Sequence, residues 1–199
     1  MIKLYLKNRP YGFVYPNDMP SCGFTEITIP VTADDIAVTG DYMDIAKNHC
    51  ACICAMNTLL VMNKNGTCGM DRISLNADRR LLFKEIHKTV KNGPVVFFKP
   101  KINKILKGLG LDIKFSPVKT LEGMEKSVKE KKPVAMLLNA GITQWHWILV
   151  IGVRKYMDGS IYLNILDGWN KTNEKFLKFK GRETFIRALM PESITESSS

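Results

Sequence analysis

The sequence predicts an α+β fold in which a helical first half packs against a sheet formed by the second half. Between residues 50 and 131 the apolar residues recur at helical spacing. From 133 to 179, short apolar runs rich in β-branched and aromatic residues alternate with turn signals. Helices and strands that are segregated along a chain are typical of α+β domains. The length of 199 residues, with 45% hydrophobic and 24% charged residues, suits one globular domain.

Residues 1–44 are expected to form an irregular or β-rich N-terminal arm. Short strands are predicted at 2–6 and 26–29, and the Pro- and Gly-rich stretch between them is typical of a loop. The arm holds three basic and six acidic residues, whereas the rest of the chain holds 26 basic and 13 acidic residues. The arm is therefore opposite in charge to the rest of the chain.

Four helices follow, and each prediction depends on its apolar spacing and on its end signals. An apolar run from Cys50 to Met62 has helical length. The segment 78–91 has one apolar face and ends at Asn92-Gly93-Pro94, and a shorter helix covers about 101–109. A charged helix at 120–131 begins with Thr120 as its N-cap.

The strands are expected at 113–115, 133–139, 147–153, 161–166 and 176–179. The turn signal Asp158-Gly159 joins two of them as a hairpin. The main domain is therefore expected to span 45–190. Residues 191–199 are small and polar, which predicts a disordered tail.

Composition and charge limit the cellular compartments and the classes of binding partner that we expect for the protein. The chain has five cysteines, an odd number, and its start lacks the unbroken apolar region of a signal peptide, so we expect reduced thiols and a cytoplasmic protein. No apolar stretch approaches the ~18 residues of a membrane span. The net charge of +10 comes mostly from scattered lysines. This favours a solvated surface over specific nucleic-acid binding, with an electrostatic binder of nucleic acid or membrane surfaces as the alternative. No particular oligomeric state is predicted.

Two groups of residues carry chemistry. In Asn48-His49-Cys50 a polar turn leads into a helix, and the N–H groups and dipole at a helix start favour the thiolate of Cys50. His146 opens one strand of the predicted hairpin and Asp167 follows the other, so the two residues are expected at the same open end. A thiol, an imidazole and a carboxylate in this order form an activated nucleophile.

These segments resemble papain-like cysteine peptidases. N-H-C-A-C-I-C-A-M-N-T-L-L is similar to their nucleophile helix, H-W-I-L-V-I-G-V to their histidine strand, and I-L-D-G-W to the strand end that carries their acidic residue. The pattern is closest to the bacteriocin-processing (double-glycine) peptidase family and its stand-alone bacterial relatives. The resemblance covers roughly residues 44–170 and implies a papain-like fold whose nucleophile lies at a helix N-terminus.

The resemblance implies a role for each catalytic residue. Cys50 would attack, His146 would transfer the proton and Asp167 would orient the imidazole. The resemblance does not supply the oxyanion donor; the Asn48 side chain, beside the Cys50 N–H group, could take that role. Trp145, Trp169 and Gln144 are expected at the substrate cleft, although Gln144 could instead be a loop residue without a role. The relatives cut peptides after Gly-Gly, so a peptide or protein substrate is implied, with no cofactor and no metal. Two positions depart from the pattern: Asp44 stands where the relatives carry an oxyanion Gln, and Ala51 where they carry Gly.

Several alternatives stay open. The main hypothesis is a cysteine peptidase-like hydrolase of peptide or amide bonds. The same triad could serve an acyl transferase, and the same fold could be a non-catalytic peptide-binding or regulatory domain. Cys50 and His146 could be core residues, Asp167 a turn residue and His49 the base. Cys52 and Cys54 lie further into the helix and are expected in the core. A metal site formed by His49, Cys50, Cys52 and Cys54 is a further alternative, which the spacing of the cysteines disfavours, because alternate residues of a helix point apart.

Overall fold

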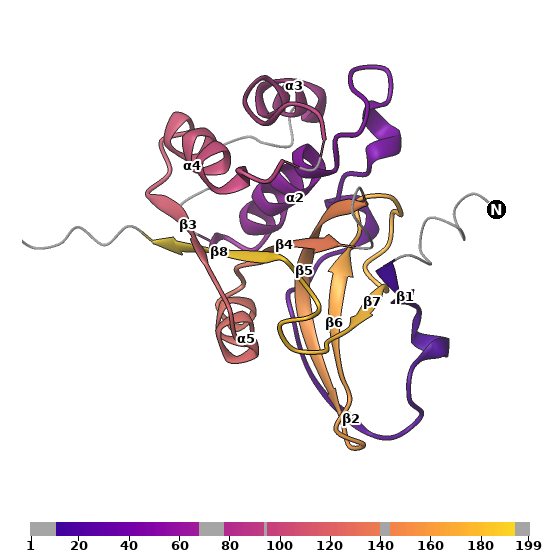
Figure 1. Cartoon of the computed structure of the whole chain (residues 1–199). Helices are drawn as coiled ribbons and strands as arrows, with labels where there is room; N and C mark the ends of the chain where they lie inside the picture. Colours follow the sequence, from indigo (N-terminus) through magenta and orange to yellow (C-terminus); the bar gives the residue numbers. More distant parts are fainter. Residues whose placement is uncertain (1–10, 68–77, 94, 140–143, 194–199) are drawn as a thin grey trace, which may run out of the picture.

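A sheet of eight antiparallel strands forms the centre of the described chain, residues 11–67, 78–93, 95–139 and 144–193 of a computed structural model (Figure 1). The strand order is β1-β7-β6-β5-β4-β8-β3, and β2 pairs with β5. The strands are β1 (Phe13–Val14), β2 (Phe24–Thr28), β3 (Ile113–Pro117), β4 (Val134–Asn139), β5 (Trp145–Tyr156), β6 (Ile161–Leu166), β7 (Phe176–Lys178) and β8 (Arg187–Ser193).

The helices lie on both faces of this sheet (Figure 1). They are α2 (Cys50–Lys64), α3 (Arg79–Val90), α4 (Phe98–Gly108) and α5 (Leu121–Lys129), with short 3-10 turns η2 (Pro16–Asp18), η3 (Ala33–Asp35) and η4 (Thr39–Tyr42). The first three α-helices cover one face and α5 covers the other. The predicted α+β class is confirmed. The Thr120 hydroxyl caps α5 as expected by accepting from the Gly123 N–H.

Strand β5 is the longest strand and supplies both sides of the core. Trp147, Leu149 and Ile151 belong to the hydrophobic cluster under α2, α3 and α4. Ile148 and Val150 alternate with them and belong to the cluster under α5. The first half of β5 pairs with β4 and the second half with β2, while β6 pairs along the opposite edge. The first residues of β5, Trp145 and His146, pair with Asn139 and Leu138 of β4, which fixes their position at the edge of the site.

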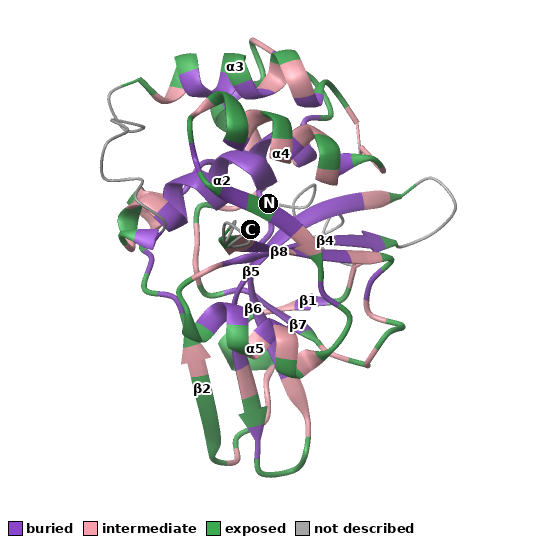
Figure 2. Cartoon of the chain, turned by 90° about the vertical axis from the view of Figure 1, so that its left-hand side faces the viewer, coloured by how far each residue is buried: buried purple, intermediate pink, exposed green. Residues whose placement is uncertain are grey.

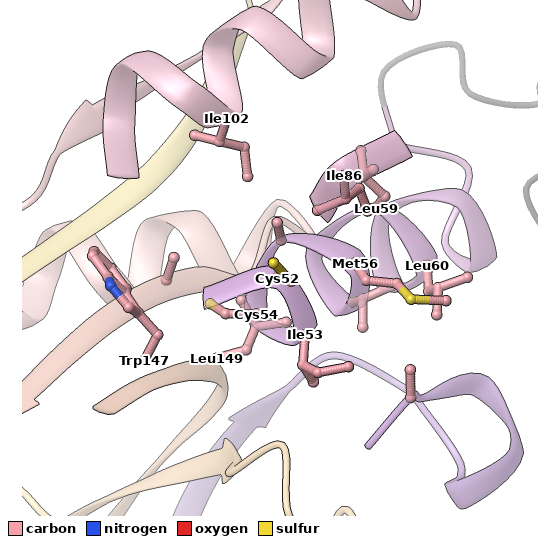
Figure 3. Packing of buried hydrophobic residues seen from close by; sticks show 14 of the residues in the cluster. Cys52, Ile53, Cys54, Met56, Leu59, Leu60, Ile86, Ile102, Trp147 and Leu149 are labelled. Carbon is pink, nitrogen blue, oxygen red and sulfur yellow. The ribbon is translucent and has the colours of Figure 1, made fainter. Parts of the chain in front are cut away.

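Helix α2 is the buried centre of the helical layer. Its residues from Ala51 to Met62 are all buried (Figure 2), and a helix that is apolar all round is typical of a core position. Figure 3 shows Cys52 and Cys54 on this helix among apolar neighbours that include Ile102, Trp147 and Leu149.

Residues that precede α2 belong to the same core. Strand β2 pairs with β5 over five residues, and Ile29, Ile36 and Tyr42 are buried in the cluster that contains α2. The side chain of Asn57 on α2 accepts from the Ala37 N–H at 2.7 Å and donates to the Ala37 carbonyl at 2.9 Å. Residues 29–42 are thus packed against α2.

The C-terminal end differs from the expected tail. Strand β8, which the sequence did not indicate, runs from Arg187 through Ser193, so residues 191–193 are ordered in the sheet. Beyond Leu189, β8 pairs with β3 and no longer with β4. One edge of the strand is therefore unpaired there, and Pro191, which has no N–H group, is tolerated. The predicted strand at 2–6 and the tail residues 194–199 lie outside the described residues. In the described ranges, no helix is long and apolar enough to cross a membrane.

Candidate active site

A cavity of about 580 Å³ lies where the N-terminus of α2 meets the start of β5. Cys50 is the first residue of α2, His146 is the second residue of β5, and both line this cavity. Trp145 and Trp169 line it as well. Residues that are far apart in the sequence are therefore gathered here, because a buried helix and a buried strand both begin at this point.

The chain turns sharply before Cys50. Asn48 has a positive φ of 50°, a left-handed conformation that Asn tolerates better than most residues. Its carbonyl accepts from the Gly93 N–H, which ties the turn to the segment after α3. His49 then serves as the N-cap position of α2. This turn lets the half-buried Cys50 face the cavity at the mouth of the helix.

The thiol of Cys50 does not have the lowered pKa that its helix position predicts. Burial raises its pKa above the usual value, and this is the largest influence. Backbone hydrogen bonds from Trp147, Ala51 and Cys50 itself act in the opposite direction and are weaker. The sequence argument considered the helix start but not the loss of water around the sulfur. Formation of a thiolate therefore requires a nearby base.

The imidazole of His146 is held in one orientation. Its Nε2 lies 2.7 Å from the main-chain carbonyl oxygen of Asp167. A carbonyl only accepts hydrogen bonds, so Nε2 carries the proton and Nδ1 carries the lone pair of the neutral ring. The indole of Trp169 stacks on the imidazole, with ring centroids 3.8 Å apart and planes at 18°.

The carboxylate of Asp167 has other partners. It accepts from the N–H groups of Trp169 and Asn170, from the Asn170 side chain and from the Lys175 ammonium. Lys175 and Asp167 are almost fully buried, with side-chain exposures of 0% and 1%. The expected contact between Asp167 and His146 is present, but it is made by the carbonyl. The carboxylate stabilises the turn that carries this carbonyl.

Gly168 shapes the same turn. It has a positive φ of 72°, and a Cβ atom there would lie 3.2 Å from the Ile53 side chain on α2. Its carbonyl accepts from the Thr39 N–H at 2.8 Å. A glycine therefore lets the loop after β6 approach α2 closely.

Some of the predicted oxyanion and cleft residues line the cavity and others do not. Asn48 is exposed and lines the cavity beside Cys50. Asp44 is exposed, pairs with Arg80 and is not among the residues that line the cavity. Gln144 is not a lining residue either: its side chain is exposed, and its carbonyl accepts from the Tyr11 hydroxyl at 3.0 Å.

Sequence reasoning missed several residues of this site. Tyr11, Met43 and Lys47 line the cavity, and Lys175 supports the loop beneath it. Tyr11 lies in a Pro- and Gly-rich stretch, and Lys175 in a charged segment, so neither stood out by pattern. Every second residue from 11 to 15 is aromatic. This period of two, which is typical of a strand, was the one signal in the sequence for a strand near the site.

His49 also lines the cavity and is 2% exposed. Its Nε2 lies 3.1 Å from the Thr39 carbonyl, and burial lowers the pKa of the ring. Its ring lies edge-on to Phe83 at 5.2 Å. His49 is therefore packed into the wall under the turn, which favours a structural role over that of the base.

The remaining cysteines of α2 are core residues. The Cys52 thiol donates to the Lys91 carbonyl and the Cys54 thiol to the Ile148 carbonyl, each at 3.3 Å. Burial raises the pKa of Cys52 to about 12 and that of Cys54 well above its usual value. Across the described ranges, no group of three or more His, Cys, Asp or Glu side chains is placed to hold a metal ion.

Comparison with known proteins reveals a fold relationship. No family model matches the sequence, and no curated protein matches it. Among solved structures, one described as a "putative C39-like peptidase" from Bacillus anthracis superposes with a TM-score of 0.56 at 12% sequence identity. The match covers 85% of this chain and 98% of that chain. The chain therefore shares the α+β fold of that structure over nearly all of the latter's length.

Proposed function

We propose that the protein is a cysteine peptidase-like hydrolase that acts on peptide or amide bonds, with Cys50 as nucleophile and His146 as base. The observation that carries the proposal is the shared cavity. There the Cys50 sulfur lies at a helix start, and the imidazole donates through Nε2 and keeps the lone pair of Nδ1. The fold of the Bacillus anthracis structure supports the same class. Within this class, the nucleophile motif favours the bacteriocin-processing peptidases and their stand-alone bacterial relatives.

The reaction begins with a proton transfer. Nδ1 of His146 takes the proton of the Cys50 thiol, and the thiolate attacks the carbonyl carbon of the substrate. The Cys50 N–H group and the Asn48 side chain donate to the developing oxyanion. Nδ1–H then protonates the leaving amine as the C–N bond breaks, which leaves a thioester on Cys50. Water attacks the thioester and gives a proton to Nδ1 of His146. The C–S bond then breaks, the carboxylic acid leaves, and Nδ1–H returns its proton to the Cys50 sulfur.

Asp167 acts in this scheme through its main chain. Its carbonyl accepts from Nε2–H throughout the cycle and keeps the other ring nitrogen directed to its proton-transfer role. Trp169 covers one face of the imidazole, which excludes water from this hydrogen bond and strengthens it.

A non-catalytic peptide-binding domain is the second candidate. The observation that favours it is the raised pKa of the Cys50 thiol, since a buried neutral thiol is a weak nucleophile. An acyl transferase would use the same thioester and an amine in place of water, and product analysis with added amines separates it from a hydrolase.

The test is peptide cleavage by the intact protein. A mixture of unstructured peptides is incubated with the parent chain and with the Cys50→Ser and His146→Ala variants, and the products are identified by mass spectrometry. We expect cleavage at defined bonds by the parent only, with the variants reduced by a factor of about 10³ or more. Peptide binding without cleavage, equal in the parent and the variants, would favour the binding domain.

A further inference from the structure

Three aromatic residues of the N-terminal segment lie against the proposed catalytic groups. Tyr11, Phe13 and Tyr15 alternate along this segment, and we call them the aromatic strap. Tyr11 and Phe13 stack on each other with ring centroids 5.6 Å apart. Phe13 is fixed in place, because β1 pairs with β7 through Phe13 and Leu177.

Tyr11 contacts the base with its ring. Its ring centroid is 5.4 Å from that of His146 and 5.8 Å from that of Trp169. The rings of His146 and Trp169 are themselves stacked, so the three rings form a triangle that encloses one side of the imidazole.

Tyr11 also contacts the start of β5 with its hydroxyl. The hydroxyl donates to the carbonyl of Gln144, the residue directly before β5. Burial raises the pKa of this phenol, and the negative charge of a Cys50 thiolate raises it further. The phenol therefore stays protonated and continues to donate when the thiolate forms.

The rest of the strap lies over the ion pair beneath the site. The Lys175 ammonium is 5.5 Å from the Phe13 ring centroid and 5.3 Å from that of Tyr15. The same ammonium pairs with the Asp167 carboxylate. The strap thus contacts both partners of the Nε2 hydrogen bond: the imidazole through Tyr11, and the Asp167 turn through Lys175.

We propose that Tyr11 is a positioning residue for His146: the Tyr11 ring holds the imidazole in the orientation that keeps Nε2–H on the Asp167 carbonyl, so that Nδ1 acts as the base for Cys50. This inference rests on the function proposed above. Packing against the rings of Tyr11 and Trp169 restricts the tilt of the imidazole more than a hydrogen bond at its edge does. A misplacement of about 1 Å in a catalytic group can cost about 10²-fold in rate.

The test measures the imidazole directly. Nitrogen-15 NMR of the three histidines reports which ring nitrogen of neutral His146 carries the proton. The rate of Cys50 alkylation by limiting iodoacetamide reports its action as a base. Both are measured in the parent, Tyr11→Ala and Tyr11→Phe. Phe24→Ala is the matched control, because Phe24 is an aromatic residue of the N-terminal segment that is 49% exposed on β2.

In Tyr11→Ala we expect a mixture of the two tautomers and alkylation that is slower by about tenfold or more. Tyr11→Phe keeps the ring and should restore the single Nε2–H tautomer, with a rate within about threefold of the parent. Phe24→Ala should match the parent. An unchanged tautomer in Tyr11→Ala, whatever its rate, would overturn the proposal. If Tyr11→Ala does not fold, Tyr11→Leu fills the space without an aromatic ring and is judged by the same criterion.

This result can be separated from failure of the proposed function. If Cys50 of the parent is no more reactive than the other cysteines, the hydrolase proposal fails. The tautomer comparison still shows whether Tyr11 orients His146.

Discussion

At the scale of single residues, the main-chain carbonyl and the side-chain carboxylate of Asp167 have different partners, which a sequence motif does not distinguish. Its carbonyl accepts from the His146 ring, and its carboxylate accepts from Lys175 and the turn that follows. Breaking a buried ion pair on one side costs about 3–5 kcal/mol, because the other charge stays buried.

We therefore expect Asp167→Asn to lower the free energy of unfolding by about 3–5 kcal/mol in a urea titration. The double variant Asp167→Asn/Lys175→Met removes both charges and should regain most of that stability. Because the carbonyl remains, the double variant should also keep a Cys50 alkylation rate near that of the parent. A stable double variant that reacts as slowly as His146→Ala would show that the carboxylate itself is needed.

The residue scale also shows what the sequence could and could not predict. Cys50 and His146 were predictable because each stands at the beginning of a strongly apolar element, where helix and strand ends meet in a fold of this class. The carbonyl role of Asp167 was not, since main-chain contacts leave no mark on residue type. Lys175 was hidden for a related reason: a lysine in a charged segment is usually solvated, and its burial depends on tertiary packing.

At the scale of elements, the thiols of α2 make stability depend on pH. The folded protein holds Cys52 and Cys54 neutral, with the pKa of Cys52 raised to about 12, whereas the unfolded chain ionises its cysteines near pH 8.5. Between these values the unfolded state binds fewer protons than the folded state. The contribution of these two thiols to the free energy of unfolding is therefore fully present below about pH 8.5 and is lost as the pH rises above that value.

We expect the free energy of unfolding to decline between pH 9 and 11 by up to about 1.4 kcal/mol per pH unit for each of these thiols. Cys52→Ala should reduce the slope by one thiol's share, as measured by urea titrations at several pH values. An equal slope in the parent and in Cys52→Ala would contradict this account.

The junction between β2 and β5 depends on a glycine. A Cβ atom at Gly152 would lie 2.9 Å from the Thr28 hydroxyl oxygen and 3.0 Å from the Ile27 carbonyl oxygen. We expect Gly152→Ala to cost about 1–3 kcal/mol of stability through overpacking. Gly108→Ala, at a position in α4 with no atom within 4 Å of the added Cβ, is the control and should be neutral or slightly stabilising. Equal thermal midpoints for the two variants would contradict the close approach.

The elements themselves were largely predictable from spacing. The helices at 78–91 and 120–131 and the strands at 133–139 and 161–166 lie where their apolar patterns placed them. Strand β8 was missed, because Arg187–Ser193 has a proline and no regular alternation. Its place in the sheet is set by its partners β4 and β3, which a local pattern does not report.

At the scale of the whole molecule, residues 29–42, which precede α2, contribute buried side chains to the core. Tyr42 is 3% exposed and stacks on Phe83 of α3 with centroids 4.2 Å apart, whereas its neighbour Met43 is 71% exposed. The sequence indicated an arm because of the polar and acidic composition of this segment, yet several of its apolar residues, such as Ile29, Ile36 and Tyr42, are buried.

We expect Tyr42→Ala to lower the free energy of unfolding by about 3 kcal/mol or more, as is usual when a buried aromatic side chain is removed. Met43→Ala should change it by less than about 0.5 kcal/mol. Chemical unfolding followed by circular dichroism measures both. A loss in Tyr42→Ala no larger than that in Met43→Ala would mean that the segment contributes little to the core.

The central claim is that His146 activates Cys50, and the pH dependence of Cys50 alkylation tests it most directly. Because burial alone raises the pKa of this thiol, it should react at pH 6–7 only if the imidazole takes its proton. We predict that the parent labels at Cys50 first in this range. His146→Ala should label there only as the pH rises above the usual value for a thiol. Overlapping pH profiles for the two proteins would contradict the account.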